Sequence, residues 1–103
     1  MYATSADPWQ LQARWYDRRE YAITLAVLPY ARYRHALEPG CSVGVLTEML
    51  TLRCDHVTST DVATAALDAA HQRLVHAGRR DRVTLLRRSI DEPWPAGQFD
   101  LVV

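Results

Sequence analysis

A tight glycine turn separates two apolar segments near the middle of the chain. Residues 35–37 form a short apolar run that ends in Glu38 and is broken by Pro39 and Gly40. Residues 43–53 then carry apolar side chains at helical spacing, which predicts a strand, a turn and a buried helix. Parallel strands need such crossover helices, so this unit favours an open parallel sheet.

The rest of the chain repeats the alternation of strand and helix. Residues 56–60 are rich in β-branched types, residues 62–77 form an alanine-rich helical pattern, residues 83–87 read as a third strand, and residues 99–103 follow a Pro-rich loop. This order predicts the α/β class, with a Rossmann-like open parallel sheet in three α/β/α layers and right-handed crossovers. Because the sequence stops inside the fourth strand, we expect an incomplete sheet.

Two helix starts precede the first strand. Asp7 can cap a helix in which Pro8 takes the first position. Asp17 and Glu20 are spaced as in a capping box, which predicts a second helix that ends near Leu28. The sequence therefore predicts a helical cap, residues 1–33, ahead of the N-terminal part of a Rossmann-like domain, residues 34–103.

Composition narrows the class of partner. The formal net charge is zero, with twelve basic and twelve acidic residues, so no basic field favours nucleic acid or an anionic membrane surface. The longest mostly apolar stretch, residues 21–28, is too short for a membrane span. The start of the chain lacks the pattern of a signal peptide, and a cytoplasmic location is expected. Neither the two cysteines nor the four histidines have the spacing of a metal site.

The glycine turn is the expected mouth of a cofactor site, because ligands of such sheets bind at the carboxyl ends of the strands. A dinucleotide fingerprint needs a glycine where this chain has Ser42, whose side chain would crowd a pyrophosphate. S-adenosylmethionine has no phosphate, and the Glu38 carboxylate suits its cationic tail, directly or through water. The alternative is that Glu38 only caps local amides or pairs with an arginine.

Polar residues also follow the second and third strands. Asp61 lies 21 residues beyond Gly40, the spacing at which an acidic residue accepts hydrogen bonds from ribose hydroxyls. It can equally cap the next helix, and the two roles are compatible. After the third strand, Ile90 is placed to pack on an adenine ring, and Ser89 or Asp91 to accept from its amine.

These residues resemble the class I S-adenosylmethionine-dependent methyltransferase family. Residues 37–44 resemble its first motif, residues 60–62 its acidic second motif, and residues 94–103 the segment that leads into strand four. The resemblance implies S-adenosylmethionine as the cofactor, with Cys41 as a small residue that packs the turn. The cofactor-binding residues it implies are Glu38, Gly40, Cys41, Gly44, Asp61, Val62, Ser89 and Ile90.

A narrower resemblance covers the front of the chain. Residues 7–11 and 16–19 are similar to the nodulation-type N-methyltransferase subfamily, which methylates a free amine of a chitin-oligosaccharide precursor. The resemblance implies a small-molecule methyl acceptor, an amine or sugar-linked compound. Tyr16, Arg18 and Arg19 either form part of a lid over the cofactor or belong to a solvated helix start. The sequence identifies no catalytic residue.

Two other classes compete with this interpretation. A half sheet that ends at its fourth strand leaves an open edge, so the chain could be a non-catalytic fragment or interaction module that self-associates through that edge. A dinucleotide-binding oxidoreductase is the third reading, and Ser42 disfavours it.

Overall fold

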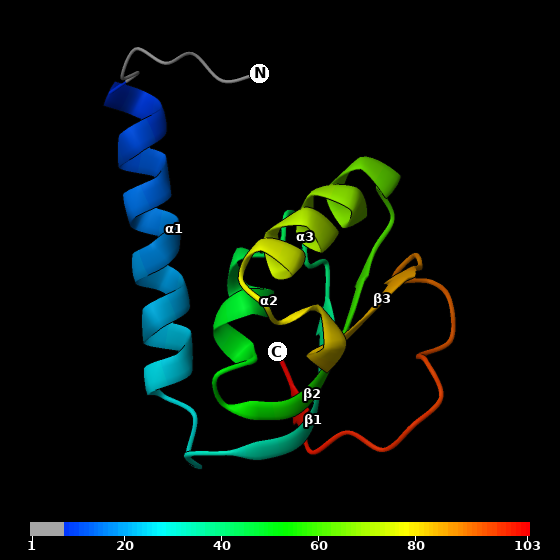
Figure 1. Ribbon diagram of the computed structural model, residues 1–103. Coiled ribbons are helices and arrows are strands. Elements are labelled where there is room, and N and C mark those ends of the chain that lie inside the picture. The colour runs from blue at the N-terminus through cyan, green and yellow to red at the C-terminus, as the bar shows by residue number, and fades with distance from the viewer. Residues whose placement is uncertain (1–7) are drawn as a thin grey trace.

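The computed structural model describes residues 8–103, and the chain begins in it with one long helix, α1 (Pro8–Ala26) (Figure 1). The prediction of two N-terminal helices is wrong. Asp17 lies in the middle of α1, where its backbone is already helical and cannot serve as the extended N-cap of a second helix. The cap predicted at Asp7 lies outside the described residues.

Four parallel strands form one sheet, in the order β3-β2-β1-β4. They are β1 (Tyr33–Pro39), β2 (Cys54–Asp61), β3 (Val83–Arg87) and β4 (Leu101–Val102). The chain runs outward from β1 to β2 and β3, and it then returns to place β4 on the other side of β1. The topological switch point of the sheet therefore lies between β1 and β4. The predicted Rossmann-like parallel sheet is confirmed.

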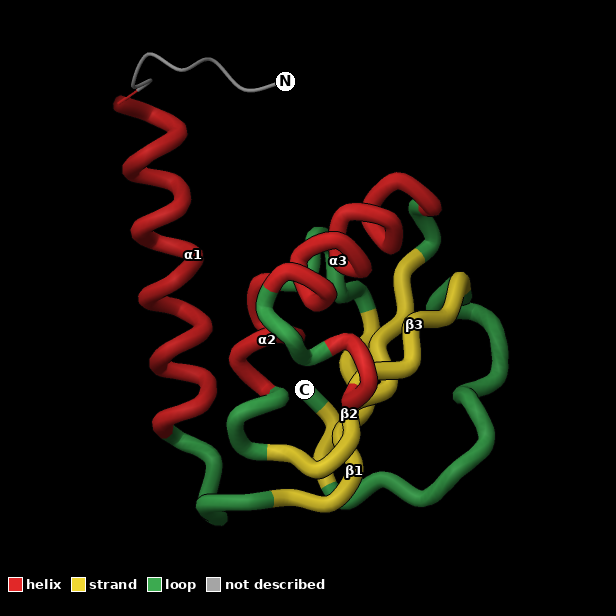
Figure 2. Tube along the Cα trace, in the orientation of Figure 1, coloured by secondary structure: helices red, strands yellow, loops and turns green. Residues whose placement is uncertain are grey.

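The helices α2 (Val45–Leu50) and α3 (Thr64–His76) pack on one face of this sheet, and a short 3₁₀ helix, η1 (Arg80–Arg82), leads into β3 (Figure 2). Leu50 of α2 and Leu74 of α3 are fully buried against Ala36 and Val57 of the central strands. Leu25 and Leu28, at the end of α1 and after it, pack on the edge of the same cluster. The core therefore forms where the strand–helix crossovers fold back on the sheet.

The observed α2 and α3 are shorter than the sequence predicts. Residues 43 and 44 belong to the glycine turn and not to the helix predicted from residue 43, because Ser42 and Gly44 both have positive φ angles. Helix α3 begins two residues after Val62, since the Asp61 carboxylate accepts the Ala63 N–H at 2.9 Å and holds residues 62 and 63 outside the helix. Strand β2 begins at Cys54, two residues before the strand that the sequence predicts from residue 56.

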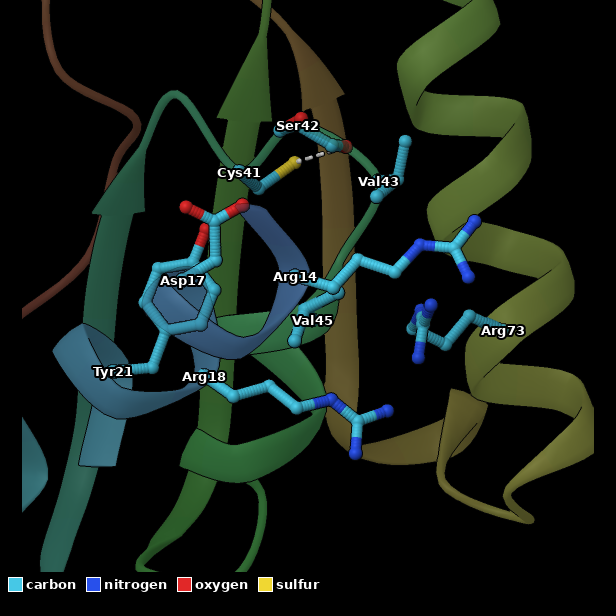
Figure 3. A pocket seen from close by; sticks show the side chains of 9 residues that line it. All are labelled: Arg14, Asp17, Arg18, Tyr21, Cys41, Ser42, Val43, Val45 and Arg73. Carbon is cyan, nitrogen blue, oxygen red and sulfur yellow. Dashed lines mark hydrogen bonds between the residues drawn. The ribbon is translucent and has the colours of Figure 1, made fainter. Parts of the chain in front are cut away.

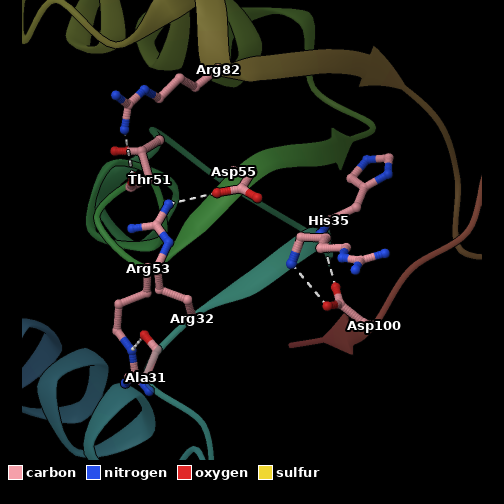
Figure 4. A network of polar contacts seen from close by, with 9 residues as sticks. Ala31, Arg32, His35, Thr51, Arg53, Asp55, Arg82 and Asp100 are labelled. Atoms are coloured by element: carbon pink, nitrogen blue, oxygen red, sulfur yellow. Dashed lines mark hydrogen bonds and ion pairs between the residues drawn. The ribbon is translucent and has the colours of Figure 1, made fainter.

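The loop between β3 and β4 leads to the side of β1 that faces away from β2. Asp100 anchors the C-terminal end of this loop to β1 (Figure 4). Asp100 accepts the Arg34 and His35 N–H groups at 2.8 Å each, just before β4. Ahead of β1, the Arg53 guanidinium binds the carbonyl oxygens of Leu25, Tyr30 and Ala31. Among residues 8–103, none of the helices combines the length and the apolar character that a membrane span requires.

Candidate functional site

The turn after β1 is fixed by the neighbouring strand. The Cys41 N–H donates to the Thr60 carbonyl at 2.9 Å, and the Gly44 N–H closes the turn on the Cys41 carbonyl at 3.0 Å. Gly44 has a φ of +87°, and a Cβ there would lie 2.9 Å from the Cβ of Ala70 in α3. Gly40 has a φ of +69° and open space on its Cβ side. Gly44 thus permits close helix packing, while Gly40 leaves the backbone approachable from outside.

Asp61 ends β2 and organises the turn and the next helix together. One carboxylate oxygen accepts the Ser42 N–H at 2.9 Å, and the other accepts the Ala63 N–H at 2.9 Å. Each oxygen keeps acceptor capacity, because an ionised carboxylate offers about four lone-pair sites. Ala63 is itself the N-cap of α3, and no side chain caps this helix, so the capping role considered for Asp61 is not observed. Asp61 instead fixes the residue before the helix, and it also lines a cavity.

Glu38 lies beneath the turn, at the end of β1. Only 3% of the residue is exposed, and its Oε1 accepts hydrogen bonds from Thr47 at 2.5 Å and from Ser59 at 2.8 Å. Neither partner is an amide or an arginine, so the local roles considered for Glu38 are not those observed. Burial raises the pKa of Glu38 to about 7, although both hydroxyl donors act in the opposite direction. The group is thus poised between its charged and neutral forms near neutrality.

A cavity of about 350 Å³ lies at the carboxyl ends of β1, β2 and β3, and we call it the strand-end cavity. It contains five of the eight predicted site residues. Gly40 and Asp61 line one part of it, and Ser89 and Ile90 line another. Val62 also borders it and is 58% exposed. The full set of lining residues is Pro39, Gly40, Thr60, Asp61, Val62, Arg88, Ser89 and Ile90.

A second cavity of about 350 Å³, the cap cavity, lies between α1, the turn and α3 (Figure 3). Its lining residues are Arg14, Asp17, Arg18, Tyr21, Cys41, Ser42, Val43, Val45 and Arg73. Figure 3 shows the Asp17 carboxylate and the Tyr21 ring on the side below Cys41, whereas the guanidinium groups extend toward α3. Both cavities are within the size range of small-molecule sites.

The thiol of Cys41 is not a reactive group. Burial and the charges of Glu38 and Asp61 raise its pKa to about 12, which keeps the sulfur protonated and weakly nucleophilic. The residue is 4% exposed and packs inside the turn. Burial and then the nearby charge of Asp17 raise the pKa of Tyr21, so this phenol also keeps its proton.

Sequence reasoning found only part of the α1 side of the site: it considered Arg18 for a lid, but it assigned Arg14, Asp17 and Tyr21 to no site. Arg14, Asp17, Arg18 and Tyr21 follow the i, i+3, i+4, i+7 spacing of one helix face, and that spacing is the signal that could have found them. Of the proposed lid residues, Arg18 lines the cap cavity, and Tyr16 and Arg19 do not.

Two partners of Glu38 were missed as well. Thr47 could be found only from the way in which its helix, α2, packs on the sheet. Ser59 lies directly opposite Glu38 in the register of β1 with β2, and a register is set in three dimensions.

The fold and the turn together define a Rossmann-like protein of the methyltransferase type. A family model described as nodulation protein S (NodS) matches residues 3–103, and the chain belongs to the NodS family. It is 31% identical over 98 residues to Nodulation protein S of Bradyrhizobium diazoefficiens, across 94% of this chain and 46% of that protein.

Two solved structures agree with this placement. N-methyltransferase NodS from Bradyrhizobium japonicum WM9, in complex with S-adenosyl-l-homocysteine, superimposes with a TM-score of 0.77 and 29% identity, covering 96% of this chain and 50% of that one. A candidate methyltransferase from Pseudomonas syringae gives a TM-score of 0.73 and 43% identity, covering 85% and 55%. The matched segments cover 29%, 46% and 32% of three NodS proteins, so this chain spans less than half the length of these relatives.

Proposed function

We propose that this chain is the cofactor-binding part of an S-adenosylmethionine-dependent methyltransferase. The observation that carries the proposal is the joint geometry of the turn and Asp61. One carboxylate positions the turn through Ser42 while it borders the strand-end cavity. Family membership supports the same activity.

The residues present fit this cofactor. Gly40 has no side chain, and the space that a side chain would occupy there is open. Gly40 and Asp61 both line the strand-end cavity. Asp61 is assigned to the ribose hydroxyls, and Ser89 and Ile90 are assigned to the adenine. Ile90 is 88% exposed, so a planar base that packs on it would remove apolar surface from water.

The chain's own part in the reaction is to bind and orient. The bound cofactor supplies a methyl group that its sulfonium has already activated, so the protein contributes mainly proximity. Glu38, fixed by Thr47 and Ser59, supplies negative charge under the turn when it is ionised. Helix α1 covers the opposite side of the turn and borders the cap cavity. We assign the described part of the predicted cap, residues 8–32, to this role, since Tyr33 already begins β1.

The methyl acceptor is assigned as a small-molecule amine. The support is the likeness to a structure described as an N-methyltransferase. The cytoplasmic location stays a prediction, as does self-association through the open sheet edge.

Calorimetric titration with S-adenosylhomocysteine tests the proposal. We expect saturable binding to this chain, weakened about tenfold or more by Asp61→Asn, since the substitution removes the charge from hydrogen bonds to ribose. Asp55→Asn is the matched control, because Asp55 lies on the same strand with an exposed partner, Arg32. Binding of NAD but not of S-adenosylhomocysteine would overturn the assignment.

A further inference from the structure

Helix α1 has two faces that differ in their surroundings. The face toward the rest of the molecule has a charged half, which borders the cap cavity. The opposite face carries Tyr16, Ile23 and Val27 at i, i+7 and i+11, a spacing that places them along one side of the helix. Arg19 and Glu20 lie between Tyr16 and Ile23 on the same side. We call these five residues the outer stripe.

The outer stripe is open to solvent. Tyr16, Ile23 and Val27 are each more than half exposed, and Figure 1 shows α1 at one side of the molecule, with the other elements on one side of it only. Trp15, next to the stripe, is also more than half exposed, and its ring packs edge-to-face on Tyr16 with the centroids 5.1 Å apart. Because aromatic side chains gathered on an exposed helix face are typical of a protein interface, the stripe is a candidate docking surface.

The charges of the outer stripe lie at its centre. Arg19 and Glu20 are adjacent, with Tyr16 three residues before Arg19 and Ile23 three residues after Glu20. Within the described part of the chain, neither charged side chain has an ion-pair partner. The Arg19 guanidinium stands over the Trp15 ring, 5.6 Å from its centroid, so it lies on the outside of the helix. From either end, the stripe therefore has the same order: an apolar side chain, two opposite charges and an apolar side chain.

This order makes the stripe complementary to itself in one orientation. If a two-fold axis crosses α1 between residues 19 and 20, Arg19 of each copy lies opposite Glu20 of the other copy. The same axis places Tyr16 of each copy opposite Ile23 of the other, so both apolar positions are covered. A parallel pair in the same register would place Arg19 against Arg19 and Glu20 against Glu20, and like charges in contact disfavour it. The charges of the stripe thus favour an antiparallel pair of identical helices.

We propose that the outer stripe of α1 binds the outer stripe of a second copy of this chain, with the two helices antiparallel. The stripe carries one cation and one anion, so its charge complementarity is to itself and not to an acidic or a basic partner. The contact area is small, which places the dimer among weak complexes with a dissociation constant of about 10–100 μM. Neither cavity takes part, so this pairing does not depend on the proposed function.

Sedimentation equilibrium from about 5 to 500 μM tests the pairing with two charge reversals. Arg19→Glu and Glu20→Arg each place like charges opposite one another, so each should weaken dimerisation about tenfold or more. An equimolar mixture of the two variants should associate within about threefold of the wild-type affinity, because every charge in the mixed dimer again faces its opposite. Asp68→Arg, at an exposed position of α3, is the matched control and should leave dimerisation unchanged. Ile23→Asp, which removes an apolar contact, should also weaken it about tenfold.

Several outcomes would overturn the proposal. A wild-type chain that stays monomeric up to about 500 μM would leave the stripe to a different partner. Dimerisation that neither charge reversal nor Ile23→Asp weakens would place the contact on another surface, such as the open sheet edge. If the two charge reversals weaken dimerisation and their mixture does not restore it, the antiparallel register is wrong. Circular dichroism of each variant shows whether the helices are intact, so that a loss of dimerisation is not a loss of folding.

Discussion

At the scale of single residues, Glu38 is a carboxyl group buried beneath the turn, with only 3% of the residue exposed. Burial penalises the charged form of this carboxyl and raises its pKa from the ordinary value of 4.5 to about 7. The native state therefore holds a proton that the unfolded chain loses above about pH 4.5. The stability that this proton contributes is complete below that pH, and it is lost as the pH rises to about 7.

Glu38→Gln tests this, because the amide keeps its shape and does not titrate. Relative to the variant, the wild-type chain should lose roughly 2–3 kcal/mol of unfolding free energy between pH 4.5 and 8. Urea denaturation across that range measures the difference. A pH-independent difference between the wild-type chain and Glu38→Gln would contradict the burial argument.

Gly44 supports a second prediction at this scale. An added Cβ would approach Ala70 to 2.9–3.0 Å, and the φ of +87° adds strain to any side chain. Gly44→Ala should therefore destabilise the fold by about 2–4 kcal/mol. Gly78→Ala is the matched control, since Gly78 has a φ of +72° with nothing within 4 Å, and should cost only about 1 kcal/mol. Equal losses in thermal denaturation would disprove the close contact of the turn with α3.

At the scale of elements, β4 is held to β1 by a short ladder and by Asp100. Only two residue pairs form the register between these strands, so the Asp100 carboxylate contributes a large share of the polar contacts. The two N–H donors lower the pKa of Asp100, and this stabilisation is lost as the pH falls through the acid range.

Asp100→Asn replaces one acceptor oxygen by a donor, so one of the two backbone N–H groups loses its partner. We expect faster hydrogen exchange at Arg34, His35 and Val103, with β2 and β3 unaffected. Asp55→Asn is the control, because Asp55 lies on β2, which does not pair with β4. Unchanged protection of β4 would mean that backbone pairing alone docks this strand.

At the scale of the whole molecule, α1 is joined to the sheet at its end and covers the cap cavity with its charged half. Arg53 binds three carbonyl oxygens between residues 25 and 31 and so fixes the connection that aims the helix. Arg53→Gln should increase hydrogen exchange throughout α1 while the sheet amides stay protected. The control is Arg32→Gln, which removes only an exposed ion pair. Loss of protection in the sheet itself would show that α1 is part of the same cooperative unit.

The sequence alone determined the fold class and the identity of the turn. Strand–helix alternation forces parallel pairing, and the break at Pro39 and Gly40 between apolar segments marks the carboxyl end of β1. The residue spacing also singled out Asp61, which the structure brings to the turn through Ser42. These features are local or depend on short sequence distances, so they can be deduced without coordinates.

Tertiary structure decided the rest. The capping-box pattern at Asp17 favoured a break, yet α1 continues through it, because a local signal of about 1 kcal/mol does not outweigh the rest of the helix and its packing. The partners of Glu38 come from α2 and β2, nine and 21 residues away, and only packing and register bring them together. The charged face of α1 became part of a site because the connection from residue 27 to β1 places it over the turn. Each of these depends on where separate elements dock, which spacing along one chain does not encode.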